Sequence, residues 1–328
     1  KGNSSSSFTP NTSNILVETG GELSFKESQK SAPANKQGDF IEYWKPLRRK
    51  VKETFSSTQI VEAKNKKDRA EGIRETEEKI KSQDLVINGS SAFVATNNSG
   101  ERIEANSEKM YEACSLIKVP LAILYIEKAG GLEKIDMQKK DLLIKLLSQS
   151  SEHAFKILFE ELTNVLGAID SPLLWEKGSL LFISMCTKRF GSNSKFGFDE
   201  QRGTIKMSGN TAIAFLESVM KLPSSERRFV IDALEAKDES NQNWGANFIE
   251  AKKGLRQSLS VSEFHKIGLG MDDKKELNSV HEMGGFVDNT GKYVLYVILN
   301  EYNRTQTKFS NVDSFSAEAL SSAVEVLV

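Results

Sequence analysis

The sequence predicts a mixed α/β protein of the α+β type, whose main domain forms one antiparallel sheet from its two ends. Two strand-like stretches come first, at 91–96 and 101–105, and helix-like stretches fill the middle of the chain. Strand-like stretches then return near the C-terminus. We therefore expect helices on both faces of the sheet, together with an all-helical subdomain inserted between its first and last strands.

The composition is that of an ordinary globular protein long enough to bury a large core. Of the 328 residues, 38% are hydrophobic and 27% are charged. The 44 Lys and Arg residues nearly balance the 45 Asp and Glu residues, which excludes a global positive field for nucleic acid or an anionic membrane. The sequence has no run of 18 apolar residues, so it predicts no transmembrane span.

The two cysteines, Cys114 and Cys186, cannot build a disulfide framework or a thiolate metal site. Whether they form one bridge is left open by the sequence. The chain begins at Lys1 and not at Met, so we expect a processed or truncated product whose export signal lay in the missing part.

The chain falls into three predicted segments. Residues 1–40 are rich in Ser, Asn and Gly and predict a flexible linker or stalk. Residues 41–84 form a charged helical segment, in which 63–81 carries alternating charges and no Pro. Residues 85–328 form the main domain. One helix face is indicated by four apolar residues spaced by four, Tyr43, Leu47, Val51 and Phe55.

Within the main domain, a turn of Asn, Asn, Ser and Gly joins the first two strands into a hairpin. Residues 116–129 are apolar on nearly all sides and end at two glycines, which predicts a largely buried helix. Helical periodicity recurs at 142–147, 152–162, 174–185, 210–222, 225–234 and 316–326. Strands separated by turn residues are predicted at 264–269, 281–287 and 293–299.

Ser115 and Lys118 open the apolar helix and lie three residues apart, so they share one helix face. Free N–H groups and the helix dipole at a first turn favour developing negative charge. A buried lysine has a lowered pKa and can take the serine proton. The same spacing occurs at Ser192–Lys195 and Ser218–Lys221, but neither of these pairs opens an apolar helix. The alternative for Ser115 is a plain helix N-cap.

Two later stretches extend this pattern. Ser150-Ser151-Glu152 lies between two helical patterns, and Lys266-Ile267-Gly268 lies in a strand. In this order, the stretches resemble the motifs Ser-x-x-Lys, Ser-x-Asn and Lys-Thr/Ser-Gly of the penicillin-recognising serine hydrolases, which include class A β-lactamases and D-Ala-D-Ala peptidases. The strand pair 281–287 and 293–299 is also similar to that family's. The resemblance covers roughly residues 85 to 328 and implies a β-lactamase/transpeptidase-like fold.

The resemblance implies a role for each matching position. Ser115 would be the acylated nucleophile, and Lys118 its general base. Ser150 would relay a proton to the leaving group, and Lys266 would hold the substrate carboxylate. The backbone N–H groups of Ser115 and Leu269 would form an oxyanion hole, which is typically worth about 3 kcal/mol at the transition state.

Two positions depart from the family motifs. Glu152 stands where the family has Asn, and a carboxylate there can pair with Lys118 or Lys266 and keep that lysine protonated. Ile267 stands where the family has Thr or Ser, so a hydroxyl expected to bind the substrate carboxylate is missing. With Gly268, these two residues are the candidates for substrate binding.

Other side chains near the motifs receive structural interpretations. His153, His265 and His281 lie beside the motifs but lack the spacing of metal ligands, so no metal is expected. Cys114 is interpreted as a packing residue beside the helix start. Between residues 167 and 208 there is no Glu-x-x-Leu-Asn string of the class A type, so a β-lactam acyl-enzyme is expected to turn over slowly.

These observations predict a serine hydrolase or acyltransferase that cleaves an amide bond through an acyl-serine, with cell-wall peptide as the substrate class. No cofactor is expected, and the partner is a small-molecule or peptide substrate, either cell-wall peptide or a β-lactam. We expect an extracytoplasmic location, secreted or tethered to the envelope. Two alternatives stay open: a weak or inactive relative that binds peptidoglycan or a protein, and a class A-like β-lactamase.

Overall fold

The computed structural model describes residues 57–86, 90–191, 195–235, 245–271, 277–302 and 309–328. The predicted stalk of residues 1–40 lies outside the described residues, as does the predicted charged segment before residue 57. The chain divides into units of residues 1–63 and 64–328. The elements below belong to the second unit, apart from the first residues of helix α2.

One antiparallel sheet of five strands has the order β2-β1-β8-β7-β6. Strands from the two ends of the domain meet at its centre, where Phe93 pairs with Ile298. The predicted fold class is therefore confirmed. The strands are β1 (Ser90–Asn97), β2 (Arg102–Ala105), β6 (Ser262–Met271), β7 (Leu277–Val287) and β8 (Tyr293–Glu301).

Strand β8 explains why the sheet needs cover on both faces. Successive side chains of a strand point to opposite faces, and nearly every residue of β8 is buried. Leu295, Val297 and Leu299 contribute to the core on one face. Tyr296 and Ile298 contribute to the core on the other.

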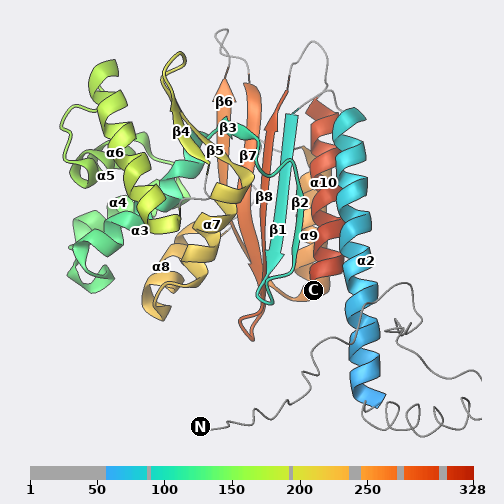
Figure 1. The fold of residues 1–328 in the computed structure, drawn as a ribbon. Coiled ribbons are helices and arrows are strands. Elements are labelled where there is room, and N and C mark those ends of the chain that lie inside the picture. The colour runs from blue at the N-terminus through green and yellow to red at the C-terminus, as the bar shows by residue number, and fades with distance from the viewer. Residues whose placement is uncertain (1–56, 87–89, 192–194, 236–244, 272–276, 303–308) are drawn as a thin grey trace, which may run out of the picture. The chain divides into compact units, whose positions relative to one another are not determined.

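Three helices cover the second of these faces (Figure 1): α2 (Ser57–Val86), α9 (Ala246–Leu259) and α10 (Phe309–Leu327). Helix α2 spans the stretch 63–81, for which the charge pattern predicts a helix. Helix α9 is not predicted from the sequence, because Phe248 and Lys252 are its only buried side chains and it contains Gly254. The apolar residues Phe248, Leu255 and Leu259 recur at helical spacing, but a lysine stands in the position between the first two of them and weakens the pattern.

Helix α7 (Gly209–Met220) packs against β1, β7 and β8 on the opposite face. Beside it lies the inserted helical region, in which Phe155, Phe159, Trp175 and Phe182 stack with ring centroids 5.2 to 6.3 Å apart. Among the described helices, none is both long and apolar enough to cross a membrane. The inserted helices are α3 (Lys118–Ala129), α4 (Met137–Ser148), α5 (Glu152–Thr163), α6 (Pro172–Phe190) and α8 (Ser224–Leu234).

A small second sheet, of order β3-β5-β4, also lies in the inserted region and is not predicted from the sequence. Its strands are β3 (Met110–Glu112), β4 (Phe196–Asp199) and β5 (Thr204–Ser208), and they are too short to show a clear alternation. The Ala113 N–H donates to the Ile205 carbonyl at 2.8 Å, so this sheet fixes the chain immediately before Ser115.

Candidate active site

Ser115 lies in a short 3₁₀ turn, η1 (Cys114–Ile117), which leads directly into α3. The predicted helix therefore begins with a tighter turn, and Ser115 precedes α3. Cys114 adopts a left-handed conformation with φ of 46°, which is uncommon for a residue other than glycine. Leu116 and Ile117 are buried and anchor the turn. The half-buried Ser115 is thus presented at the N-terminal end of α3.

Lys118 is the first residue of α3, and its side chain is only 3% exposed. Its Nζ lies 3.3 Å from the Oγ of Ser115 and 3.1 Å from the Oγ of Ser150. It also donates to the Ser150 carbonyl at 2.7 Å and forms an ion pair with Glu152. The structure therefore brings together the first two of the three predicted motifs.

The segment before α5 positions Ser150 and Glu152. Ser150 has a φ of 54°, and in this conformation both its carbonyl and its hydroxyl oxygen lie against Lys118. Ser151 caps the helix, because its Oγ accepts from the Ala154 N–H at 3.2 Å. Glu152 is then the first residue of α5, with a side chain that is 78% exposed.

The third motif reaches the same place from β6, an edge strand of the main sheet. A Cβ on Gly268 would lie 3.0 Å from the Cβ of Cys114 and 3.3 Å from the backbone N of Ser115. The backbone of β6 therefore approaches η1 so closely that only glycine fits at residue 268 without displacing its neighbours. Lys266 lies two residues away on the same face of the strand.

Lys266 is 5% exposed. Burial and the charge of Lys118, opposed by the Glu152 carboxylate, lower the pKa of its amine to about 7. A substantial fraction of the Lys266 amine is therefore neutral near pH 7.

The neighbours of Lys266 on β6 face the other way. The side chains of Ile267 and Leu269 pack against the core beneath α9 and α10. The substrate contact predicted for Ile267 therefore involves its backbone, and it stays a prediction. The oxyanion-hole role of Leu269 also uses only a backbone N–H and stays a prediction too.

One residue of the site is missed by sequence reasoning. The Nζ of Lys118 lies 5.7 Å from the centre of the Phe155 ring, within the range of a cation–π contact. In the sequence, Phe155 is one more apolar position of an amphipathic helix. No local signal distinguishes it from the other apolar residues of α5.

The cysteines and two of the histidines have structural surroundings. Cys114 and Cys186 are both free, and burial raises the pKa of the Cys114 thiol to about 12, so it is not a thiolate nucleophile. His281 is fully buried, and burial lowers its pKa to about 3. Its Nδ1 accepts from the Asn300 N–H at 3.1 Å. His153 is exposed on α5.

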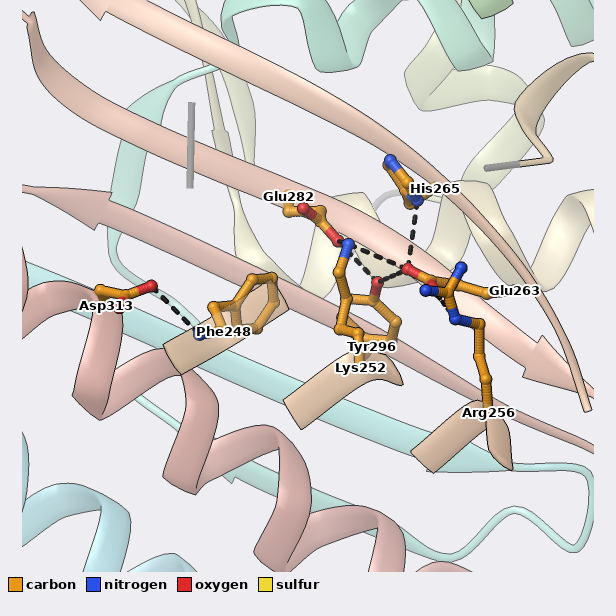
Figure 2. Close-up of polar contacts among 8 residues, drawn as sticks. All are labelled: Phe248, Lys252, Arg256, Glu263, His265, Glu282, Tyr296 and Asp313. Atoms are coloured by element: carbon orange, nitrogen blue, oxygen red, sulfur yellow. Dashed lines mark hydrogen bonds and ion pairs between the residues drawn. The ribbon is translucent and has the colours of Figure 1, made fainter. Parts of the chain in front are cut away.

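A second charged cluster lies on the opposite face of the sheet, beneath α9 (Figure 2). The candidate ligand atoms of Glu263, His265 and Glu282 lie within 4.8 Å of one another, which is compact enough for a metal ion. However, the Nζ of Lys252 lies 2.9 Å from a carboxylate oxygen of each glutamate. The Nε of Arg256 lies 3.4 Å from Glu263.

Two cations thus already balance the two carboxylates of this cluster, and a divalent ion would leave an excess of buried positive charge. Burial opposes ionisation of Glu263, but its contacts with His265 and Lys252 hold its pKa at about 2. The Tyr296 hydroxyl donates to Glu282 at 2.6 Å. The cluster therefore joins α9 to the sheet as an internal ion pair.

No family model and no curated protein matches the chain. A β-lactamase from Chitinophaga pinensis is 12% identical, with a TM-score of 0.58, over 76% of this chain and 99% of its own. The TLA-1 extended-spectrum β-lactamase is 14% identical, with a TM-score of 0.60, over 78% and 99%.

A representative class A β-lactamase from Bacteroides cellulosilyticus is 10% identical, with a TM-score of 0.57, over 78% of this chain and 98% of its own. The TM-scores of 0.57 to 0.60 establish a shared fold. At 10 to 14% identity, a shared fold does not by itself imply a shared activity. The predicted β-lactamase-like architecture is therefore confirmed.

Proposed function

We propose that this chain, which has the fold of the penicillin-recognising serine hydrolases, is a serine hydrolase or acyltransferase that cleaves an amide bond through an acyl-serine. One observation carries the proposal. The Nζ of Lys118 lies within 3.3 Å of the Ser115 hydroxyl and 3.1 Å of the Ser150 hydroxyl, beside the strand that carries Lys266. A nucleophile, a proton relay and two amines thus share one site.

The residues support a two-step reaction. The Oγ of Ser115 attacks the substrate carbonyl while its proton passes to the amine of Lys118, and the backbone N–H groups of Ser115 and Leu269 stabilise the oxyanion. Removing one such donor from an enzyme typically costs about 3 kcal/mol at the transition state. Ser150 relays this proton from Lys118 to the leaving amine as the carbon–nitrogen bond breaks, and water or an acceptor amine then releases the acyl group.

We propose cell-wall peptide as the substrate class, and an extracytoplasmic location follows from it. Strand β6 is at the edge of the sheet, where an extended peptide can pair with a free strand edge. Within the described residues, one bridge, between Glu235 and Phe264, occupies the outer side of β6. Elsewhere along this edge, no strand of the described residues pairs with β6.

A second candidate function is a weak or inactive relative that binds peptidoglycan or a protein partner. The ion pair between Glu152 and Lys118 favours it, because a carboxylate partner stabilises the ammonium form of a lysine. A β-lactamase is a third candidate, and the solved structures above carry that name. Between residues 167 and 208, where the class A glutamate string is absent, two of the acids form ion pairs with lysines. These pairs are Asp170 with Lys156 and Asp199 with Lys206.

Labelling with a fluorophosphonate and with a fluorescent penicillin tests the proposal. We expect covalent labelling of the full chain that disappears in Ser115→Ala. The matched control is Ser218→Ala, because Ser218 belongs to another Ser-x-x-Lys pair and is buried on α7. A folded protein that stays unlabelled at high probe concentration would favour the binding module. Steady hydrolysis of a chromogenic cephalosporin would favour the β-lactamase.

A further inference from the structure

Three charged side chains meet in the candidate active site, and they differ in their exposure to solvent. The side chain of Lys118 is 3% exposed and Lys266 is 5% exposed, whereas the side chain of Glu152 is 78% exposed. Lys118 and Glu152 both act on the charge of Lys266, so the three groups share one electrostatic environment. A ligand that arrives from solvent therefore meets the Glu152 carboxylate before it meets either amine.

Glu152 also lies close to the proposed reacting atom. The Nζ of Lys118 contacts the Oγ of Ser115 at 3.3 Å and a carboxylate oxygen of Glu152. Two atoms that contact the same nitrogen in this way lie at most about 6 Å apart. If Ser115 is the nucleophile, as proposed above, its Oγ bonds to the carbonyl carbon of the substrate. A substituent two or three bonds from that carbon is then within reach of Glu152.

The Glu152 carboxylate can bind a ligand in addition to Lys118. An ionised carboxylate accepts at two oxygens, with about four lone-pair sites. Its Oε1 contacts Lys118, and no other hydrogen bond of Glu152 is found among the described residues. The remaining sites are therefore available to a ligand. Because a carboxylate only accepts, it binds ammonium and N–H groups and repels a second carboxylate.

The positive charges of the site are buried and partly neutralised. The Glu152 carboxylate pairs with Lys118 directly. Burial and the charge of Lys118, opposed by Glu152, lower the pKa of the Lys266 amine to about 7, so part of its charge is absent at neutral pH. The side chain of Ile267 packs on the opposite face of the sheet, so this position of β6 offers no hydroxyl to an anionic substrate group. Beside Ser115, a cationic substituent is therefore better matched than an anionic one.

We propose that Glu152 is a specificity-determining residue, which selects substrates that carry an ammonium group in the acyl part, two or three bonds from the scissile carbonyl. The leaving amine lies at the Ser150 hydroxyl in the reaction proposed above, which leaves Glu152 to the acyl part. A peptide meets this requirement with a free α- or β-amino group on the residue before the scissile amide. This selectivity presupposes the acyl-serine at Ser115.

Three activated esters that differ in one terminal group test the selectivity. They are the para-nitrophenyl esters of β-alanine, butyric acid and succinic acid, which carry an ammonium, a methyl or a carboxylate group on acyl chains of nearly equal length. The measurement is the rate constant for acylation of Ser115 at about pH 7, followed by the mass of the intact protein, with Ser115→Ala as the blank. We expect the ammonium ester to react about fivefold faster than the methyl ester, and the carboxylate ester about fivefold slower.

Variants of Glu152 identify the group responsible. Glu152→Gln removes the charge and keeps the size, and it should bring the three rate constants within about twofold of one another. Glu152→Asp keeps the charge and should keep the order. The comparison is between esters within one variant, so a change in the contact of Ser115 with Lys118 that affects all three esters equally does not disturb it.

The matched control is Glu133→Gln. Glu133 is an exposed acid in the 3₁₀ turn η2 (Leu132–Lys134), beyond the far end of α3 and about 18 Å from Lys118 along the helix. The substitution removes the same charge as Glu152→Gln and should leave the order of the three esters unchanged.

Salt provides a test on the wild-type protein, which requires no variant to fold. Screening weakens exposed charge pairs, so raising the ionic strength from about 0.01 M to about 1 M should reduce the preference for the ammonium ester. Equal acylation of Ser115 by all three esters, or an order that persists in Glu152→Gln, would overturn the selectivity and leave the acyl-serine intact. If no ester acylates Ser115, the proposed function fails as well.

Discussion

Gly268 allows β6 to approach η1 closely, and Gly268→Ala should disturb this contact. The new Cβ would lie 3.0 Å from the Cβ of Cys114, 3.2 Å from the Cγ of Leu116 and 3.3 Å from the N of Ser115. The distances of 3.0 Å and 3.2 Å are shorter than an ordinary carbon–carbon contact, and the third atom, the N of Ser115, belongs to the backbone. Strand and turn must separate by a few tenths of an ångström, and such overpacking typically costs about 1 to 3 kcal/mol of stability.

The effect on labelling should exceed the effect on stability. Catalysis is sensitive to displacements of this kind, and a misplacement of about 1 Å can cost about 100-fold. We expect Gly268→Ala to reduce the rate of fluorophosphonate labelling by about tenfold or more. Thermal unfolding should show a decrease in Tm of several degrees, and near-native circular dichroism should show that the variant folds.

Gly254→Ala is the matched control. Gly254 lies inside α9, and a Cβ there would meet nothing within 4 Å. Alanine is the better helix former, so this variant should gain up to about 1 kcal/mol of stability and label at the wild-type rate. Wild-type labelling and an unchanged Tm in Gly268→Ala would refute the close approach of β6 to η1.

Three further predictions concern side chains other than the proposed nucleophile, Ser115. Lys252→Met leaves Glu263 and Glu282 buried without their shared cation, so urea unfolding should show a loss of about 3 to 5 kcal/mol, against no change in the exposed Lys253→Met. The folded-state pKa of His281, about 3, lies below its usual 6.5, so its contribution to stability is complete above pH 6.5 and is lost as the pH falls toward 3. The free energy of unfolding should therefore fall by up to about 1.4 kcal/mol per pH unit below pH 6.5, and His281→Gln should remove this part of the slope in urea titrations. Because burial raises the pKa of Cys114 to about 12, iodoacetamide should alkylate it about 100-fold more slowly than glutathione at pH 8, and rapid alkylation would contradict its burial.

Most of the main sheet could be predicted from the sequence, because its strands are bounded by turn residues and two of them form a tight hairpin. The pairing of β1 with β8 follows from placing strands at both ends of a helical insertion. Strands β3, β4 and β5 could not be predicted, because three to five residues carry too little alternation. Helix α9 was also beyond sequence reasoning, since a buried lysine takes a position where periodicity requires an apolar residue.

The residues of the candidate site could be predicted in part. The spacing of Ser115 and Lys118 places them on one helix face, and their contact at 3.3 Å agrees with it. The resemblance of motifs, and not periodicity, predicts that Lys266 joins them from a distant strand. The direction of Ile267 could have been inferred, since alternation along β6 turns it away from the face that carries Lys266.

The sequence alone does not decide whether Glu152 pairs with Lys118 or with Lys266, because the motifs predict that all three side chains meet in one site. The structure shows that Glu152 begins α5 directly beside Lys118. The surroundings of the two lysines therefore differ, because the Glu152 carboxylate contacts the amine of Lys118 directly and acts on Lys266 only from a distance. The Nζ of Lys118 also contacts the hydroxyl oxygens of Ser115 and Ser150, so Glu152 fixes the amine between the two serines. Burial lowers the pKa of the Lys266 amine to about 7, with the charge of Lys118 acting in the same direction and Glu152 opposing both, so this lysine is the more easily discharged of the two buried positions.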